Sequence, residues 1–336
     1  MKTRIPIDLP KVELHCHLEG TIPPALAIKI AKRNKIKLSD SLFHEDVYAW
    51  DDFTSFLKAY DNASLCLRNA NDYREITYSY LKACASEGTI YVEVFVSPDH
   101  AVECGISYNE LKEGIIQAFD DAEHDFGIIG RAIVTCVRHF GPERAMEVAN
   151  TFLKDKHPYF VGFGMAGDEG HLSFVDFKPV FDHVAESGYP CTVHAGEHYS
   201  AATVLEAIDT LPVTRIGHGV RLVEDTNAVE TVSKSNIVLE ICPSSNIALG
   251  LYPDHKSHPF MKLYEAGCKV TLNSDDPPYF DTSIGHEYAN ASTEFGLSTT
   301  QLLNVTRTAL DAAFIDKELR AKLHARIDAW ETKQLS

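Results

Sequence analysis

The sequence has few of the features that mark secreted, membrane-bound or disulfide-stabilised proteins. Its eight cysteines form no C-x-x-C pair, and no apolar run reaches the 18 residues that indicate a membrane-spanning helix. The first residues also lack an apolar stretch long enough for a signal peptide. We therefore expect a cytoplasmic protein with reduced, buried thiols and no membrane partner.

Basic residues are too few to balance the acidic ones. Lys and Arg number 31 against 48 Asp and Glu, so the formal net charge is −17. This field would repel a polyanion such as nucleic acid, so a neutral or cationic small molecule is the expected ligand. The sequence also lacks low-complexity tracts and linkers, and we expect residues 1–336 to form a single domain.

Short runs rich in Val, Ile, Tyr, Phe and Thr alternate with segments of helical periodicity, which is typical of repeated βα units. The expected strands are 11–17, 89–97, 130–138, 159–165, 190–195, 214–219, 237–242 and 268–273. The expected helices between and after them are 107–126, 142–154, 173–187, 201–210, 225–234, 257–266, 283–295, 298–313 and 316–331. This pattern predicts an α/β fold, a TIM (β/α)8 barrel with extra C-terminal helices.

About 70 residues separate the first two expected strands, too many for one crossover helix. A helix is expected over 24–34, and another begins near residues 50–53. The second carries an apolar stripe at positions i, i+3, i+4 and i+7, formed by Phe53, Phe56, Leu57 and Tyr60. The segment 48–65 either packs on the barrel as core or covers the pocket as a lid.

Side chains suited to catalysis stand at the ends of the expected strands. His194 and Glu197 lie three residues apart where the fifth strand enters a Gly-containing loop. His15 and His17, at i and i+2 on the first strand, point the same way, and two converging imidazoles suit Zn²⁺. His218 lies between two glycines after the sixth strand.

Each of these features also has an ordinary structural explanation. The histidines can be satisfied strand-end residues, Glu197 can help cap the next helix, and residues 275–277 (Asp-Asp-Pro) can form a routine turn. However, the four groups fall at one face of the predicted barrel, where TIM-barrel active sites lie. Together they favour metal-assisted hydrolysis.

Six stretches carry distinctive motifs, namely residues 10–20, 166–169, 194–197, 217–220, 242–246 and 273–277. In this order, over the whole chain, they resemble the adenosine deaminase family, which includes adenine deaminases. The resemblance implies one Zn²⁺ per chain, with the ligands His15, His17, His194 and Asp275.

The same resemblance implies roles for five further residues. Glu197 would donate a proton to purine N1, and His218 would orient and deprotonate the attacking water. Asp276 would be the acceptor facing N7, the backbone N–H of Gly167 would contact N3, and Glu19 would meet the part of the substrate beyond N9. The residue types suit this chemistry, because attack at C6 needs an activated water and a protonated carboxylic acid. The fourth expected strand has no lysine to bridge a second metal, so one metal is expected.

The identity of the purine depends on Glu19. Adenosine deaminases usually carry Asp there, facing the ribose 5′-hydroxyl, whereas many adenine deaminases carry Glu, which reaches into the ribose space. Residues 242–246 and the loop after Glu197 look closer to bacterial proteins grouped with adenosine deaminases. We therefore expect zinc-dependent deamination of adenosine and 2′-deoxyadenosine to inosine and 2′-deoxyinosine. The alternative is deamination of adenine to hypoxanthine, or of another 6-aminopurine.

Two other classes of protein are less compatible with the sequence. The zinc deaminases with H-x-E and P-C-x-x-C motifs need a second cysteine after Pro190-Cys191, and none follows at that spacing. A barrel that survives only as a binding protein would be expected to have lost a ligand or the acid, and all are present. The oligomeric state is left open by the sequence.

Overall fold

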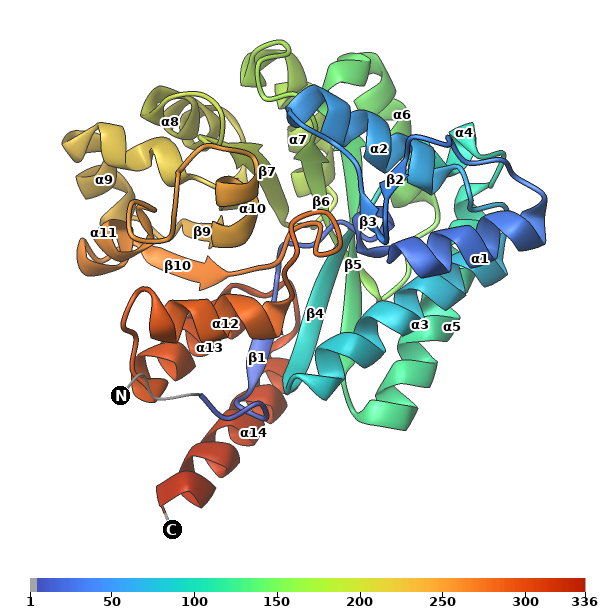
Figure 1. The fold of residues 1–336 in the computed structure, drawn as a ribbon. Helices are drawn as coiled ribbons and strands as arrows, with labels where there is room; N and C mark the ends of the chain where they lie inside the picture. The colour runs from blue at the N-terminus through green and yellow to red at the C-terminus, as the bar shows by residue number, and fades with distance from the viewer. Residues whose placement is uncertain (1–4, 336) are drawn as a thin grey trace.

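The computed structural model describes residues 5–335, and its centre is an eight-stranded parallel sheet that curls into a nearly closed barrel (Figure 1). The strands pair in chain order: β1 Lys11–Glu13, β4 Thr89–Val96, β5 Ile129–Val137, β6 Phe160–Ala166, β7 Cys191–Ala195, β8 Val213–His218, β9 Val238–Ile241 and β10 Lys269–Leu272. The TIM-like barrel predicted from the sequence is therefore confirmed.

The barrel closes between its first and last strands through a few bonds near the rim. The backbone N–H of His17 donates to the Asp275 carbonyl and that of Asp275 donates to the His15 carbonyl, both at 3.1 Å. The first strand was expected over 11–17, but its regular pairing ends at Glu13 because the Leu14 N–H donates to the Asn273 side chain at 3.0 Å instead. An irregular segment therefore carries the two histidines.

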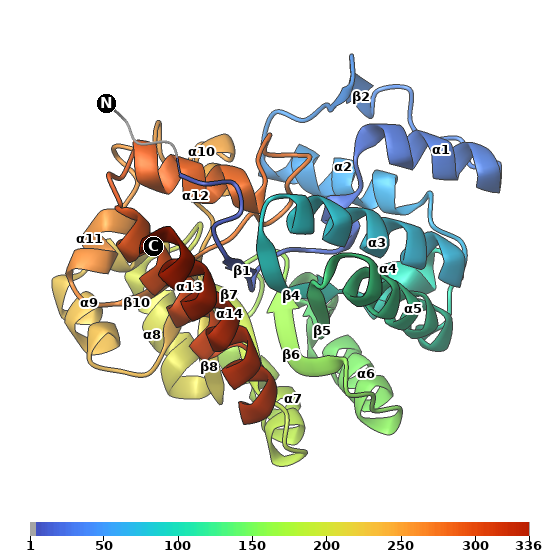
Figure 2. The ribbon, with the colours of Figure 1, turned by 90° about the horizontal axis from the view of Figure 1, so that it is seen from below.

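Helices surround the barrel at the places that the periodicity predicted. They are α5 Tyr108–Phe126, α6 Gly141–Lys154, α7 Phe174–Glu186, α8 Ala201–Thr210, α9 Thr226–Ser233, α11 Phe260–Glu265, α12 Ile284–Thr293, α13 Thr299–Ala312 and α14 Lys317–Leu335. Capping boxes fix several helix starts, with Ser107, Ser173 and Ser298 each accepting a bond from a backbone N–H inside the helix. In the view from below, α14 lies in front of the barrel (Figure 2).

The long first crossover contains more structure than was expected. It holds α1 Pro24–Asn34, a hairpin of β2 Phe43–His44 and β3 Val47–Tyr48, then α2 Phe53–Ser64 and α3 Ala70–Ser86. The apolar stripe of α2 joins Tyr48, Tyr279 and Phe280 in a small core separate from the main one. Short α4 Pro98–Glu103 and α10 Pro243–Ala248 follow β4 and β9 at the same end of the barrel. Among residues 5–335 no helix combines the length and apolarity needed to cross a membrane.

Candidate active site

Four potential metal ligands converge at the carboxyl ends of β1, β7 and β10. One donor atom from each of His15, His17, His194 and Asp275 lies within 4.8 Å of the others. Asp275 Oδ1 is 3.4 Å from His15 Nε2 and 3.3 Å from His17 Nε2, and His17 Nε2 is 3.2 Å from His194 Nε2. The residues predicted from the sequence as ligands therefore meet at one point.

This donor set fits a divalent metal such as zinc. Three imidazoles and a carboxylate are typical zinc ligands. His15 Nε2 is buried without a hydrogen-bond partner, a costly arrangement unless the nitrogen binds another group. Burial raises the pKa of Asp275, but the imidazoles of His15 and His17, 3.4 and 3.3 Å away, outweigh this effect and hold that pKa well below its usual range, which favours the ionised carboxylate.

A second set of donors, His15, His218, Cys242 and Asp275, also lies within 4.8 Å. Burial raises the pKa of the Cys242 thiol well above its usual value, and a protonated thiol is a poor ligand. The set with three histidines and Asp275 is therefore the better metal site.

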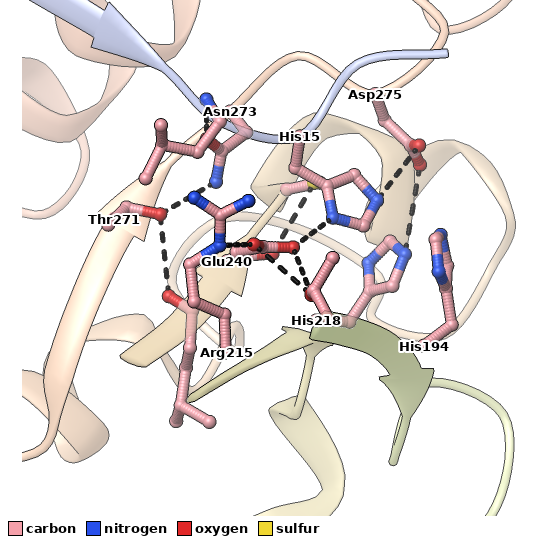
Figure 3. Close-up of polar contacts among 12 residues, drawn as sticks. His15, His194, Arg215, His218, Glu240, Thr271, Asn273 and Asp275 are labelled. Atoms are coloured by element: carbon pink, nitrogen blue, oxygen red, sulfur yellow. Dashed lines mark hydrogen bonds and ion pairs between the residues drawn. The ribbon is translucent and has the colours of Figure 1, made fainter. Parts of the chain in front are cut away.

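The outer nitrogens of two ligands are held by fixed acceptors. His15 Nδ1 lies 2.9 Å from Glu240 Oε2, and His194 Nδ1 lies 2.9 Å from the Met165 carbonyl. Figure 3 shows the Glu240 carboxylate against the His15 ring, with Asp275 on the ring's opposite side. An acceptor at Nδ1 leaves the Nε2 lone pair directed at the metal position.

Backbone geometry brings the groups unusually close. A Cβ at Gly217 would lie 2.7 Å from His15 Cε1, so only glycine lets the His15 ring pack against β8. His218 and Asp275 have φ of +60° and +62°, the left-handed region that side chains other than glycine rarely adopt. Such strained residues concentrate at functional sites.

Glu197, the predicted acid, lies beside this cluster. Its Oε1 is 3.6 Å from His218 Nε2 and accepts a hydrogen bond from Asn246 Nδ2 at 3.4 Å. Burial, then the nearby Asp275 and Glu169 carboxylates, raise the pKa of Glu197 well above its usual value. Burial also lowers the pKa of His218 well below its usual value, so the two shifts favour a protonated carboxyl beside a neutral imidazole.

The loop that carries Glu197 is held from beneath by another carboxylate. Glu169 Oε2 accepts hydrogen bonds from the N–H groups of Glu197 and His198 at 3.1 and 2.9 Å, and its Oε1 accepts from Gly196 and the Thr203 hydroxyl. These bonds fix the backbone on which the acid stands.

A small cavity of about 100 Å³ opens beside the metal ligands, Glu197 and His218. The predicted substrate residues Glu19, Gly167 and Asp276 line it, and α2 contributes Phe53, Phe56, Leu57, Tyr60 and Asp61. The segment predicted as either core or lid packs in its own small core, and its α2 side chains line this cavity. No Lys or Arg is among the lining residues.

Two buried carboxylates shape the cavity floor. Glu19 accepts hydrogen bonds from the Tyr60 and Tyr73 hydroxyls at 3.4 and 3.3 Å and from the Ser97 N–H at 3.3 Å. Asp276 Oδ1 is buried without a partner and lies against Gly20, where a Cβ would come within 1.7 Å of it. Burial raises the pKa of both groups, that of Asp276 well above its usual value.

Several positioning residues were not singled out from the sequence. Ser245 donates a hydrogen bond to Asp275 Oδ2 at 2.7 Å, and Asn246 lies between Glu197 and His218. Both belong to the motif at 242–246 but received no role. Glu169 likewise belongs to the motif at 166–169 without a role. Glu240 was missed, although a glutamate inside the apolar run 237–242 is a visible signal of a buried partner.

The barrel and its cluster of potential metal ligands, with a buried carboxyl and a buried imidazole beside them, are the features of a metal-dependent hydrolase of the TIM-barrel type. The family model described as adenosine deaminase matches residues 10–330, and the chain belongs to this family. It is therefore an aminopurine deaminase by family.

The similarity extends over complete relatives and solved structures. An adenine deaminase from Rhizobium rhizogenes strain K84 is 44% identical over 95% of this chain and 99% of its own. The crystal structure of an adenine deaminase from Arthrobacter aurescens has a TM-score of 0.89 at 28% identity, covering 96% and 99% of the two chains. An amidohydrolase from Burkholderia ambifaria with bound Zn has a TM-score of 0.88 at 25% identity, covering 98% and 92%.

These relatives correct the substrate expected from the sequence. Adenosine was preferred because residues 242–246 and the loop after Glu197 look like those of adenosine deaminases. The full-length relatives at 40–45% identity are instead adenine deaminases. The preference for adenosine was wrong because the resemblance of two loops was given more weight than the glutamate at position 19, which many adenine deaminases were expected to carry.

Proposed function

We propose that this protein hydrolyses adenine to hypoxanthine and ammonia. The observation that carries the proposal is the 44% identity, over nearly the full length of both chains, to a relative named adenine deaminase. The cavity supports it, because about 100 Å³ is well below the roughly 300–1,000 Å³ of pockets for drug-sized ligands. A bare base is the better match to so small a space.

In this proposal one zinc ion is held by His15, His17, His194 and Asp275. The solved amidohydrolase with bound Zn supports the choice of metal. When bound, zinc lowers the pKa of a coordinated water to near neutrality and so provides the nucleophile. A water alone, with a pKa of about 15.7, would be a poor nucleophile at neutral pH.

Glu197 and His218 move the protons. The protonated Glu197 carboxyl gives its proton to N1 as the water oxygen bonds to C6, and neutral His218 accepts a proton from that water. His218 passes this proton to the departing amino group, which leaves as ammonia. The second water proton returns to Glu197 as the C6 carbonyl forms, so the acid is regenerated and N1 keeps its proton in hypoxanthine.

Asp276 holds the other edge of the ring. Purine N7 has a lone pair and accepts hydrogen bonds. Burial raises the pKa of Asp276 well above its usual value, which favours the protonated carboxyl. We therefore propose that Asp276 donates its O–H to N7, in place of the acceptor role expected from the sequence. Gly167, also at the cavity, is proposed to present its N–H to N3.

Glu19 and Tyr60 would restrict the substrate to a base. The buried Glu19 carboxylate, held by two tyrosine hydroxyls and a backbone N–H, lies at the part of the cavity under α2. A ribose on N9 would have to displace this hydrogen-bonded group. Adenine needs no such displacement.

The test is direct. Zinc-loaded protein is incubated with adenine while the purine absorbance and free ammonia are followed, with Glu197→Gln protein as the control for a contaminating deaminase. Stoichiometric formation of hypoxanthine and ammonia by the wild type alone is the expected result. Folded, zinc-loaded protein that leaves adenine unchanged would overturn the proposal.

A further inference from the structure

A chain of buried ion pairs runs from the metal ligand His15 toward the opposite end of the barrel. Glu240, whose Oε2 faces His15 Nδ1, lies with Oε1 2.6 Å from Arg215 Nε. Arg215 NH1 in turn donates to Glu93 Oε2 at 2.6 Å. The three charged side chains come from β9, β8 and β4, and Figure 3 shows the first part of the chain beneath His15.

All of these charges are fully buried, so their geometry matters. Arg215, Glu93 and Glu240 each have 0% relative exposure. Burying such charges costs several kcal/mol per ion unless each is well paired, so a shift of one member leaves its neighbour unpaired. A displacement of Glu93 would therefore weaken the pairing of Arg215, and through Arg215 that of Glu240, at a cost in free energy.

The end of this series of ion pairs that lies farthest from His15 contacts the connector between α13 and α14. Glu93 Oε1 accepts a hydrogen bond from the Phe314 N–H at 2.6 Å and another from the Tyr91 hydroxyl at 2.7 Å. The Ala312 carbonyl accepts from Arg215 NH1 at 3.2 Å. The last residue of α13 and the loop that follows it thus contact two of the buried charged residues, Arg215 and Glu93.

The Phe314 ring covers the Arg215 guanidinium at this end of the series of ion pairs. It lies 3.7 Å from the Arg215 guanidinium, and both residues border a cavity of about 1080 Å³ at this side of the molecule. Arg215 nevertheless has 0% exposure, because the ring covers it. A Cβ at Gly162 would come within 2.5 Å of the ring, so a glycine in β6 makes room for it.

We infer that Arg215, Glu93 and Phe314 are positioning residues for the metal site, which hold Glu240, and through it the His15 ring, in the orientation that binds metal. The connector between α13 and α14 thereby contributes to metal affinity from the far end of the barrel. The inference rests on the proposed function only for the identity of the metal, zinc.

The test measures zinc affinity by competition with a chelator, without any purine, so the result does not depend on adenine turnover. Glu93→Gln keeps the side-chain volume but removes the charge. Phe314→Leu removes the aromatic ring that covers Arg215 but leaves the buried charged residues in place. We expect Glu93→Gln to bind zinc roughly tenfold more weakly, the lower end of the effect of outer residues in metal sites. Phe314→Leu, a milder change, should fall between it and the wild type.

Asp72→Asn is the matched control. Asp72 is a fully buried carboxylate on α3 that pairs with Arg33 and Asn34 and touches none of the proposed ligands. Its loss should lower the melting temperature of the metal-free protein while leaving zinc affinity unchanged. Circular dichroism establishes that each variant is folded.

A double-mutant cycle with Glu240→Gln separates positioning from general destabilisation. If Glu93 acts through Glu240, the double variant should lose less affinity than the product of the two single losses. Folded Glu93→Gln and Phe314→Leu that bind zinc like the wild type would overturn the inference. Equal losses in Asp72→Asn, or fully multiplicative losses in the cycle, would overturn it as well.

Discussion

Replacing Glu197 by Gln tests the proposed acid with little change in shape. In the wild type, Asn246 Nδ2 donates to Glu197 Oε1 at 3.4 Å. The amide of Gln keeps an oxygen that can accept this hydrogen bond, so the loop that carries residue 197 should stay in place. The backbone bonds to Glu169 do not involve the side chain and are unaffected. The lost property is the proton that N1 must receive.

The magnitude follows from general acid catalysis, which is typically worth about 10²–10⁴-fold. This corresponds to about 2.7–5.4 kcal/mol in the activation barrier. We therefore expect kcat on adenine to fall by at least about a hundredfold, with zinc content and melting temperature near those of the wild type. Exposed Glu265 on α11 offers the control, because Glu265→Gln makes the same chemical change far from the cavity.

The assay is steady-state deamination of adenine with parallel metal analysis. A folded, zinc-loaded Glu197→Gln variant that keeps more than about a tenth of the wild-type kcat would refute the role of Glu197 as the acid. The pH dependence provides a second readout. Because the raised pKa keeps Glu197 protonated, its contribution is present below that pKa and is lost as the pH rises through it, so kcat/KM should fall on the alkaline side.

Three further outcomes are expected. Elemental analysis should give one zinc per chain, and chelation should abolish turnover; two metals per chain, or full activity without metal, would contradict the site formed by His15, His17, His194 and Asp275. AMP should be a poor substrate because no Lys or Arg lines the cavity to hold a phosphate, so AMP turnover as fast as that of adenine would exclude this account. Glu19→Asp, shorter by one methylene, should shift the kcat/KM preference from adenine toward adenosine, and an unchanged ratio would assign ribose exclusion to another residue, such as Tyr60.

The repeating βα pattern was enough to predict the barrel. Strands buried on both faces are continuously apolar, and the helices between them begin at capping residues such as Ser107, so both signals are local in the sequence. The hairpin of β2 and β3 was missed because two residues per strand are too few to show alternation. Helix α3 was missed as well, and its buried side mixes Tyr73, Thr77 and Tyr80 with charged Asp72, so it shows no simple apolar stripe.

The candidate site was predictable to the extent that its residues lie at strand ends. His15, His17 and His194 were found because parallel strands bring their carboxyl ends together. The residues that orient them were not, because Glu240 and Arg215 meet only in the folded barrel. Each charged residue inside an apolar run indicates a buried partner, but the sequence does not say which residue that partner is.

The measurement that tests the proposed function most directly is kcat/KM for adenine and for adenosine on the same zinc-loaded preparation. If the buried Glu19 and the small cavity exclude a ribose, kcat/KM for adenine should exceed kcat/KM for adenosine by at least about a hundredfold. That ratio corresponds to about 2.7 kcal/mol, which is within the cost of leaving a buried polar group without a hydrogen-bond partner. Equal values, or a preference for adenosine, would contradict the proposal that this protein is an adenine deaminase.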